Sequence, residues 1–151
     1  MRILFLGLGN PILSDDGVGI RVVEEIKRIL GERDGIYFDT GNINSLHILD
    51  AIQGYDKVVI VDAIKKGGKP GTLYHIPLEE LEPTIHHTSL HTINLATAIE
   101  LGKRLSREMP TEISIYGIEV KDTERFSENL TPELEKRVPE IVEEVIKREM
   151  G

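Results

Sequence analysis

At 151 residues the chain is long enough to bury one compact core, and we expect residues 1–151 to form a single domain. Acidic residues outnumber basic ones by 26 to 18, and the net charge of -8 argues against nucleic acid as a partner, because binding to phosphates needs basic surface. The chain has no cysteine, which excludes disulfides and cysteine nucleophiles, and it shows neither a signal-peptide pattern nor a membrane-length apolar stretch. We therefore expect a cytoplasmic protein that does not insert into membranes.

The first predicted strand leads into a glycine-punctuated turn that carries two adjacent carboxylates. The apolar run 3–6 is typical of a buried parallel strand, and the glycines within 7–9 let the backbone turn after it. Apolar residues recur with helical spacing over 18–30, so Asp15 and Asp16 fall between strand and helix. In α/β proteins such junctions commonly hold the functional groups.

The two carboxylates receive different assignments. One Asp before an apolar helix is most often its N-cap, and we expect that role for Asp15. A second carboxylate needs another reason, such as metal binding, general acid–base chemistry or an effect on the pKa of its neighbour. We therefore assign the functional role to Asp16.

The rest of the chain alternates between predicted strands and helices. Strands are predicted over 35–41, 57–62, 72–76 and 112–118, and the weak strand 72–76 suits a sheet edge. Helices are predicted over 46–52, 91–105 and 132–145, the last with Thr131 as its cap. This alternation indicates an α/β sandwich around a mostly parallel, twisted sheet of about five strands.

Three polar residues far apart in the sequence form the candidate site. Asp62 closes the strand 57–62, so Asp16 and Asp62 should face one crevice if the first and third strands are neighbours. The third member is expected from three histidines near residue 90, and we choose His91 because its helical spacing points it toward the sheet, leaving His86 and His87 as alternatives. Two carboxylates and one imidazole suit a borderline divalent ion such as Ni²⁺ or Zn²⁺ and leave coordination positions open.

Six short motifs, taken together, resemble one protein family over nearly the whole chain. They are Gly9-Asn10 followed after four residues by Asp15-Asp16-Gly17-Val18-Gly19, then Asp39-Thr40-Gly41, Val61-Asp62-Ala63, Pro70-Gly71-Thr72, Thr88-Ser89-Leu90-His91 and Gly117-Ile118-Glu119. The family is that of the hydrogenase maturation endopeptidases, which trim the C-terminus of the large subunit of nickel-iron hydrogenases.

The resemblance implies a three-layer αβα fold and a site in which Asp16, Asp62 and His91 bind a metal. That metal is implied to be the nickel already present in the immature substrate, so no permanent cofactor is expected. The implied partner is the precursor of a nickel-iron hydrogenase large subunit, from which a C-terminal extension is removed. Asp16 and Asp62 are the expected catalytic residues, either as ligands in metal-assisted hydrolysis or as a general base.

Three alternatives compete with this interpretation. The segment Phe5-Leu6-Gly7-Leu8-Gly9-Asn10-Pro11 is similar to the first strand and turn of peptidyl-tRNA hydrolase, but the acidic chain lacks the basic surface that a tRNA substrate needs. A non-catalytic nucleotide-binding module would need glycine at position 12, where the chain has Ile12. A protein of the same fold that holds the hydrogenase precursor without cutting it is the third.

Overall fold

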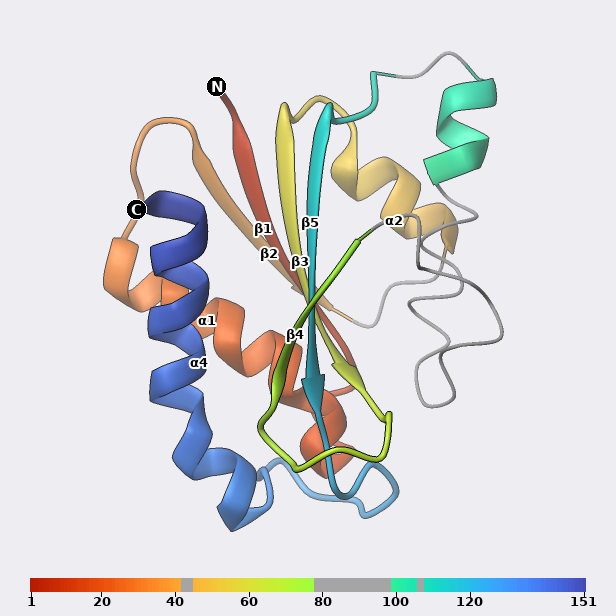
Figure 1. Cartoon of the computed structure of the whole chain (residues 1–151). Helices are drawn as coiled ribbons and strands as arrows, with labels where there is room; N and C mark the ends of the chain where they lie inside the picture. The colour runs from red at the N-terminus through yellow and green to blue at the C-terminus, as the bar shows by residue number, and fades with distance from the viewer. Residues whose placement is uncertain (42–44, 78–98, 106–107) are drawn as a thin grey trace.

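Five strands form one sheet in the order β2-β1-β3-β5-β4 (Figure 1). The structure is a computed structural model that describes residues 1–41, 45–77, 99–105 and 108–151. The strands are β1 (Ile3–Leu8), β2 (Ile36–Gly41), β3 (Lys57–Ile64), β4 (Leu73–Ile76) and β5 (Glu112–Glu119). The helices are the 3-10 turn η1 (Ser14–Gly17), α1 (Val18–Leu30), α2 (Ser45–Ile52) and α4 (Pro132–Met150).

The first, second, third and fifth strands run parallel, and only β4 is antiparallel, at the edge beside β5. The expected α/β architecture is therefore confirmed, including the weak edge strand. β1, which precedes Asp16, pairs directly with β3, which contains Asp62, so the two strands are neighbours, as the site prediction required.

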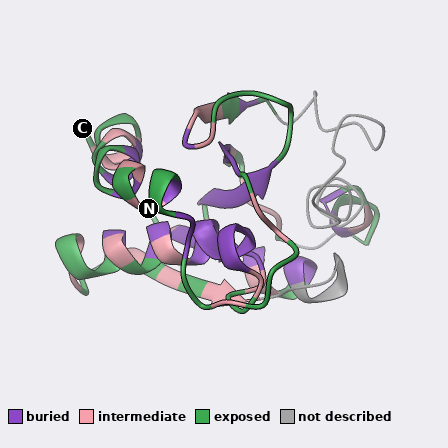
Figure 2. Cartoon of the chain, turned by 90° about the horizontal axis from the view of Figure 1, so that it is seen from below, coloured by how far each residue is buried: buried purple, intermediate pink, exposed green. Residues whose placement is uncertain are grey.

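Apolar residues on both faces of the sheet divide the core into two layers. On one face Phe5, Val59 and Val61 pack with residues of α1 and α4. On the other face Leu6 and Ile60 pack with residues of α2 and with Ile99 of the helical segment 99–104. Figure 1 shows α1 and α4 on one side of the sheet and α2 on the other, and Figure 2 shows the buried residues gathered between these layers. The three-layer αβα arrangement is confirmed.

Helix α1 begins almost in contact with the sheet backbone. A Cβ atom on Gly19 would lie 2.3 Å from the carbonyl oxygen of Val61 and 2.7 Å from that of Leu8. Only a residue without a side chain allows this approach. Gly19 therefore fixes the start of α1, and with it the preceding η1, against the ends of β1 and β3.

Two strands extend further than their sequence patterns indicated. β1 continues to Leu8 rather than ending at residue 6, and β3 continues past Asp62 to Ile64. The extra residues of β3 pair with Ile118 and Glu119 of β5, so strand pairing outweighs the local polarity of Asp62. The helix predicted over 91–105 lies partly outside the described residues, and its described part is helical over 99–104.

No helix within the described ranges is both long enough and apolar enough to cross a bilayer.

Candidate active site

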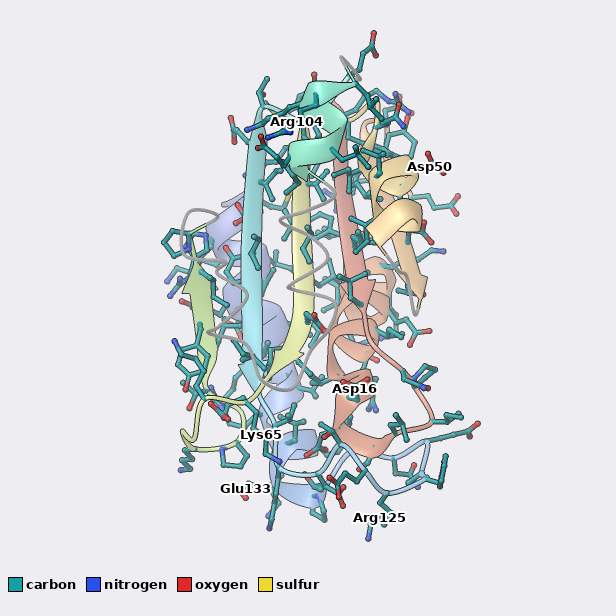
Figure 3. All side chains as sticks on the ribbon, turned by 90° about the vertical axis from the view of Figure 1, so that its right-hand side faces the viewer. Asp16, Asp50, Lys65, Arg104, Arg125 and Glu133 are labelled. Carbon is teal, nitrogen blue, oxygen red and sulfur yellow. The ribbon has the colours of Figure 1, made fainter. Side chains whose placement is uncertain are left out.

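Asp16 lies in η1, at the edge of the sheet where β1 and β3 end (Figure 3). Its side chain is largely buried, with 8% of the residue exposed, and its Oδ2 accepts a hydrogen bond of 2.9 Å from the backbone N–H of Asn10. The turn at Gly9 lies very close to η1. A Cβ on Gly9, whose φ is +146°, would lie 2.1 Å from the carbonyl oxygen of Asp16. The glycine turn therefore sets the position and direction of the Asp16 carboxylate.

Asp62 lies inside β3 and is buried, with 1% of the residue exposed. Alternation along the strand places it on the same face as Ile60 and Ile64, which pack toward α2. Its Oδ1 accepts a hydrogen bond of 2.8 Å from the N–H of Ala63. A carboxylate so enclosed needs polar contacts, because burial without them costs several kcal/mol.

The fold brings Asp16 and Asp62 to the same edge of the sheet. Val61, immediately before Asp62, pairs with Gly7 of β1, and η1 lies against β3. We use the term carboxyl edge for η1, the end of β3 from Asp62 and the segment 120–131 that follows β5. His91, together with the alternatives His86 and His87, lies outside the described residues. Within the described part of the chain, no group of three or more His, Asp or Glu residues is placed to hold a metal ion.

The N-cap role expected for Asp15 is wrong. Neither η1 nor α1 has a side-chain cap, and Asp15 is fully buried with its carboxylate turned toward the segment after β5. The carboxylate accepts hydrogen bonds from the backbone N–H groups of Lys121 (3.0 Å), Asp122 (3.1 Å) and Thr131 (2.7 Å), and from the hydroxyl of Thr131. Asp15 thus ties the loop of Asp16 to residues more than a hundred positions away.

A further buried carboxylate, Glu119, ends β5 near the same edge, and the sequence assigned it no role beyond its place in a motif. Its carboxylate accepts hydrogen bonds from the phenol of Tyr74 (2.9 Å) and from the backbone N–H of Lys66 (3.0 and 3.1 Å). Burial, followed by the hydrogen bond to Glu119, raises the pKa of Tyr74 above its ordinary value. In the sequence, Glu119 was marked only by the motif Gly117-Ile118-Glu119 at the end of the predicted strand.

Comparison with known proteins identifies the family to which the chain belongs. The family model described as hydrogenase maturation protease, HycI, matches residues 20–148, a stretch that contains Asp62 and begins just after η1. The hydrogenase 2 maturation protease of Escherichia coli is 30% identical over 148 residues, which are 97% of this chain and 89% of that protein. This chain spans 65% of the length of a hydrogenase expression/formation protein HupD from Thiocapsa roseopersicina.

Two solved structures share the fold over essentially the whole chain. The hydrogenase maturating endopeptidase HybD from E. coli superposes with a TM-score of 0.84 at 28% identity, covering 100% of this chain and 94% of the other. The [NiFe] hydrogenase maturation protease HybD from Thermococcus kodakarensis gives a TM-score of 0.71 at 29% identity, covering 98% and 99%. These similarities favour the hydrogenase maturation proteases over the peptidyl-tRNA hydrolase and nucleotide-binding interpretations. The chain belongs to the hydrogenase maturation protease family of endopeptidases.

Proposed function

We propose that this chain removes the C-terminal extension from the nickel-loaded precursor of a nickel-iron hydrogenase large subunit. The proposal is supported by membership of the family and by the T. kodakarensis relative, which is a [NiFe] hydrogenase maturation protease. The single observation that carries it is the parallel pairing of β1 with β3, which brings the Asp16 and Asp62 carboxylates to one edge. As part of this proposal the reaction takes place in the cytoplasm.

In this proposal the metal belongs to the substrate. Asp16, Asp62 and His91 complete the coordination of the nickel that the precursor carries, and the protease has no resident cofactor. The donor set suits the ion, because carboxylate oxygen and imidazole nitrogen both bind borderline divalent metals. The proposed third ligand, His91, lies outside the described residues.

The backbone around each carboxylate supports this role. The N–H of Asn10 orients Asp16, and the N–H of Ala63 orients Asp62, so each carboxylate is held in one direction before the substrate arrives. Such preorganisation lowers the cost of forming the reactive complex. The carboxylates then either hold the ion that polarises the scissile carbonyl or accept a proton from the attacking water.

The test is the mass of the precursor after incubation with the purified chain. We expect nickel-loaded precursor to lose its C-terminal extension, seen by intact-mass spectrometry as one new species, and nickel-free precursor to stay uncut. Cleavage of both forms at equal rates would contradict the role of nickel. Stable binding of the loaded precursor with no change in mass would instead favour a protein that holds the precursor without cutting it.

A further inference from the structure

Two large apolar side chains lie exposed on neighbouring loops, Ile12 in the turn that precedes η1 and Phe126 in the segment 120–131 of the carboxyl edge. Ile12 is 48% exposed and Phe126 is 81% exposed. The N–H of Ser127 donates a 2.9 Å hydrogen bond to the carbonyl of Ile12, and Leu13 and Ser127 form a parallel bridge. The positions just before that bridge, Ile12 and Phe126, are therefore side by side. We refer to these two residues as the Ile12–Phe126 patch.

The loops that present the patch are held by many hydrogen bonds. Asp15 binds the segment after β5 at three backbone N–H groups, and the hydroxyl of Ser14 donates to the carbonyl of Asn129 (3.0 Å). Immediately before Phe126, the Asp122 carboxylate accepts the N–H groups of Glu124 (3.0 Å) and Arg125 (3.1 Å) in a local turn. These hydrogen bonds hold the loop in one conformation, so the exposure of Phe126 is not that of a frayed segment.

The patch adjoins the candidate catalytic carboxylate. The Asn10 N–H that binds Asp16 lies two residues before Ile12 in the same turn. A polypeptide whose scissile bond reaches Asp16 must pass over the loops around it. On the strength of the proposed function, we propose that the Ile12–Phe126 patch docks an apolar segment of the precursor polypeptide next to the bond that is cut.

The size of the patch favours this occupant over a second copy of the chain. A buried aromatic side chain covers about 150–250 Å², whereas a stable dimer buries about 800 Å² per partner. The two side chains are therefore too small for a dimer interface by themselves. They can anchor a polypeptide whose remaining contacts are made at the catalytic site. Aromatic side chains in such positions commonly dominate the binding energy of protein contacts.

The experiment compares Phe126→Ser with the control Ile29→Ser on nickel-loaded precursor. Phe126 is mostly in solvent, so its substitution leaves the core and the backbone hydrogen bonds of the loop in place. Ile29, 52% exposed on α1, is an apolar residue of similar exposure to Ile12 but lies outside the carboxyl edge. We expect Phe126→Ser to lower kcat/KM at least about tenfold, mainly through KM, and to weaken binding of the precursor by a similar factor. Ile29→Ser should stay within about twofold of the wild type.

Three outcomes separate the alternatives. If the wild type cleaves the precursor and Phe126→Ser has a kcat/KM within twofold of it, the docking proposal is overturned while the proposed function stands. If the wild type binds the precursor without cutting it and Phe126→Ser weakens that binding, docking is supported and the proposed function fails. If sedimentation shows a wild-type dimer that Phe126→Ser dissociates, the patch is an interface between copies and docking is overturned.

Discussion

Two regions of the molecule bury carboxylates in opposite ways. Between the C-terminal end of α4 and the sheet, Glu149 of α4 forms a 2.6 Å ion pair with Lys57. It also accepts hydrogen bonds from the hydroxyls of Ser114 and Tyr116. At the carboxyl edge, Asp15 and Asp16 accept hydrogen bonds from backbone N–H groups. A lysine cancels a negative charge, whereas neutral amides stabilise it and leave it in place.

The ion-paired carboxylate and the carboxylates bound by backbone N–H groups suit different roles. A neutralised carboxylate joins α4 to the sheet and contributes to stability. Carboxylates held by amides keep a negative potential at one edge of the sheet, which suits the binding of a cation or the acceptance of a proton. The charges of Asp16 and Asp62 should therefore matter for cleavage, and the charge of Glu149 for folding.

The largest effect is expected from Asp62→Asn. The amide keeps the shape of the side chain and an oxygen that accepts the Ala63 N–H, so the fold should survive. Loss of the charge should lower the rate of precursor cleavage by about 10²- to 10⁴-fold, the range for removal of a general acid or base. Single-turnover cleavage followed by mass spectrometry, with circular dichroism as the folding control, measures this. Cleavage within tenfold of the wild type would remove Asp62 from the chemistry.

Gly19→Ala tests whether the carboxyl edge depends on the close approach of α1. The added Cβ would meet the carbonyl oxygens of Val61 and Leu8, which are backbone atoms that cannot rotate away. We expect a loss of about 3–5 kcal/mol in the free energy of unfolding. In the control Gly31→Ala the Cβ meets nothing within 4 Å, so only the backbone conformation, φ +67° and ψ −176°, costs about 1–3 kcal/mol. Equal losses in urea denaturation would show that the approach is unimportant.

Asp15→Asn tests whether the two adjacent carboxylates of η1, Asp15 and Asp16, have different roles. An amide offers one acceptor oxygen in place of two. Depending on its orientation, either the N–H of Thr131, which donates to Oδ1, or the N–H groups of Lys121 and Asp122, which share Oδ2, lose their acceptor. We expect a loss of about 2–3 kcal/mol in unfolding free energy. Cleavage should fall less than in Asp62→Asn, because Asp15 positions the loop and faces away from the substrate. If Asp15→Asn left stability unchanged and abolished cleavage, the assigned roles of Asp15 and Asp16 would be reversed.

Glu149→Gln is expected to have the smallest effect, about 1–2 kcal/mol, and a defined pH dependence. Burial alone raises the pKa of Glu149, but the ion pair with Lys57 and the hydrogen bonds from Tyr116 and Ser114 outweigh it and lower the pKa below its ordinary value. Because the folded pKa is lowered, the stabilisation is fully present above the ordinary carboxyl pKa and is lost as pH falls through the folded value. Urea denaturation of both proteins at neutral and acidic pH should show the difference shrink on acidification. A difference that grows on acidification would contradict this account.

The sequence predicted the sheet well because β1 and most of β3 are continuous apolar runs. β3 and β5 were found within two residues at each end, and the edge strand β4 was found from its weaker pattern and nearby glycines. Asp62 was misplaced at the end of a strand because its polarity suggested a boundary that pairing with β5 overrides.

The candidate site was predictable only in its local part. The position of Asp16 followed from the strand, turn and helix around it. The true partners of Asp15 lie at residues 121–131, and the pairing of Lys57 with Glu149 joins residues 92 positions apart, so no short-range pattern announces either. Such contacts depend on how the layers pack, and residues that are neighbours in the sequence carry no information about that packing.

The central claim is that the charges of Asp16 and Asp62 serve cleavage, whereas the hydrogen bonds of Asp15 and the ion pair of Glu149 serve stability. It is tested most directly by measuring, for Asp16→Asn, the rate of cleavage of nickel-loaded precursor together with the free energy of unfolding. We predict that cleavage is lost, by at least about a hundredfold, and that the unfolding free energy stays within about 1 kcal/mol of the wild type, as for an isosteric change at a hydrogen bond that an amide oxygen can still accept. Cleavage at the wild-type rate by a stably folded Asp16→Asn protein would contradict the account.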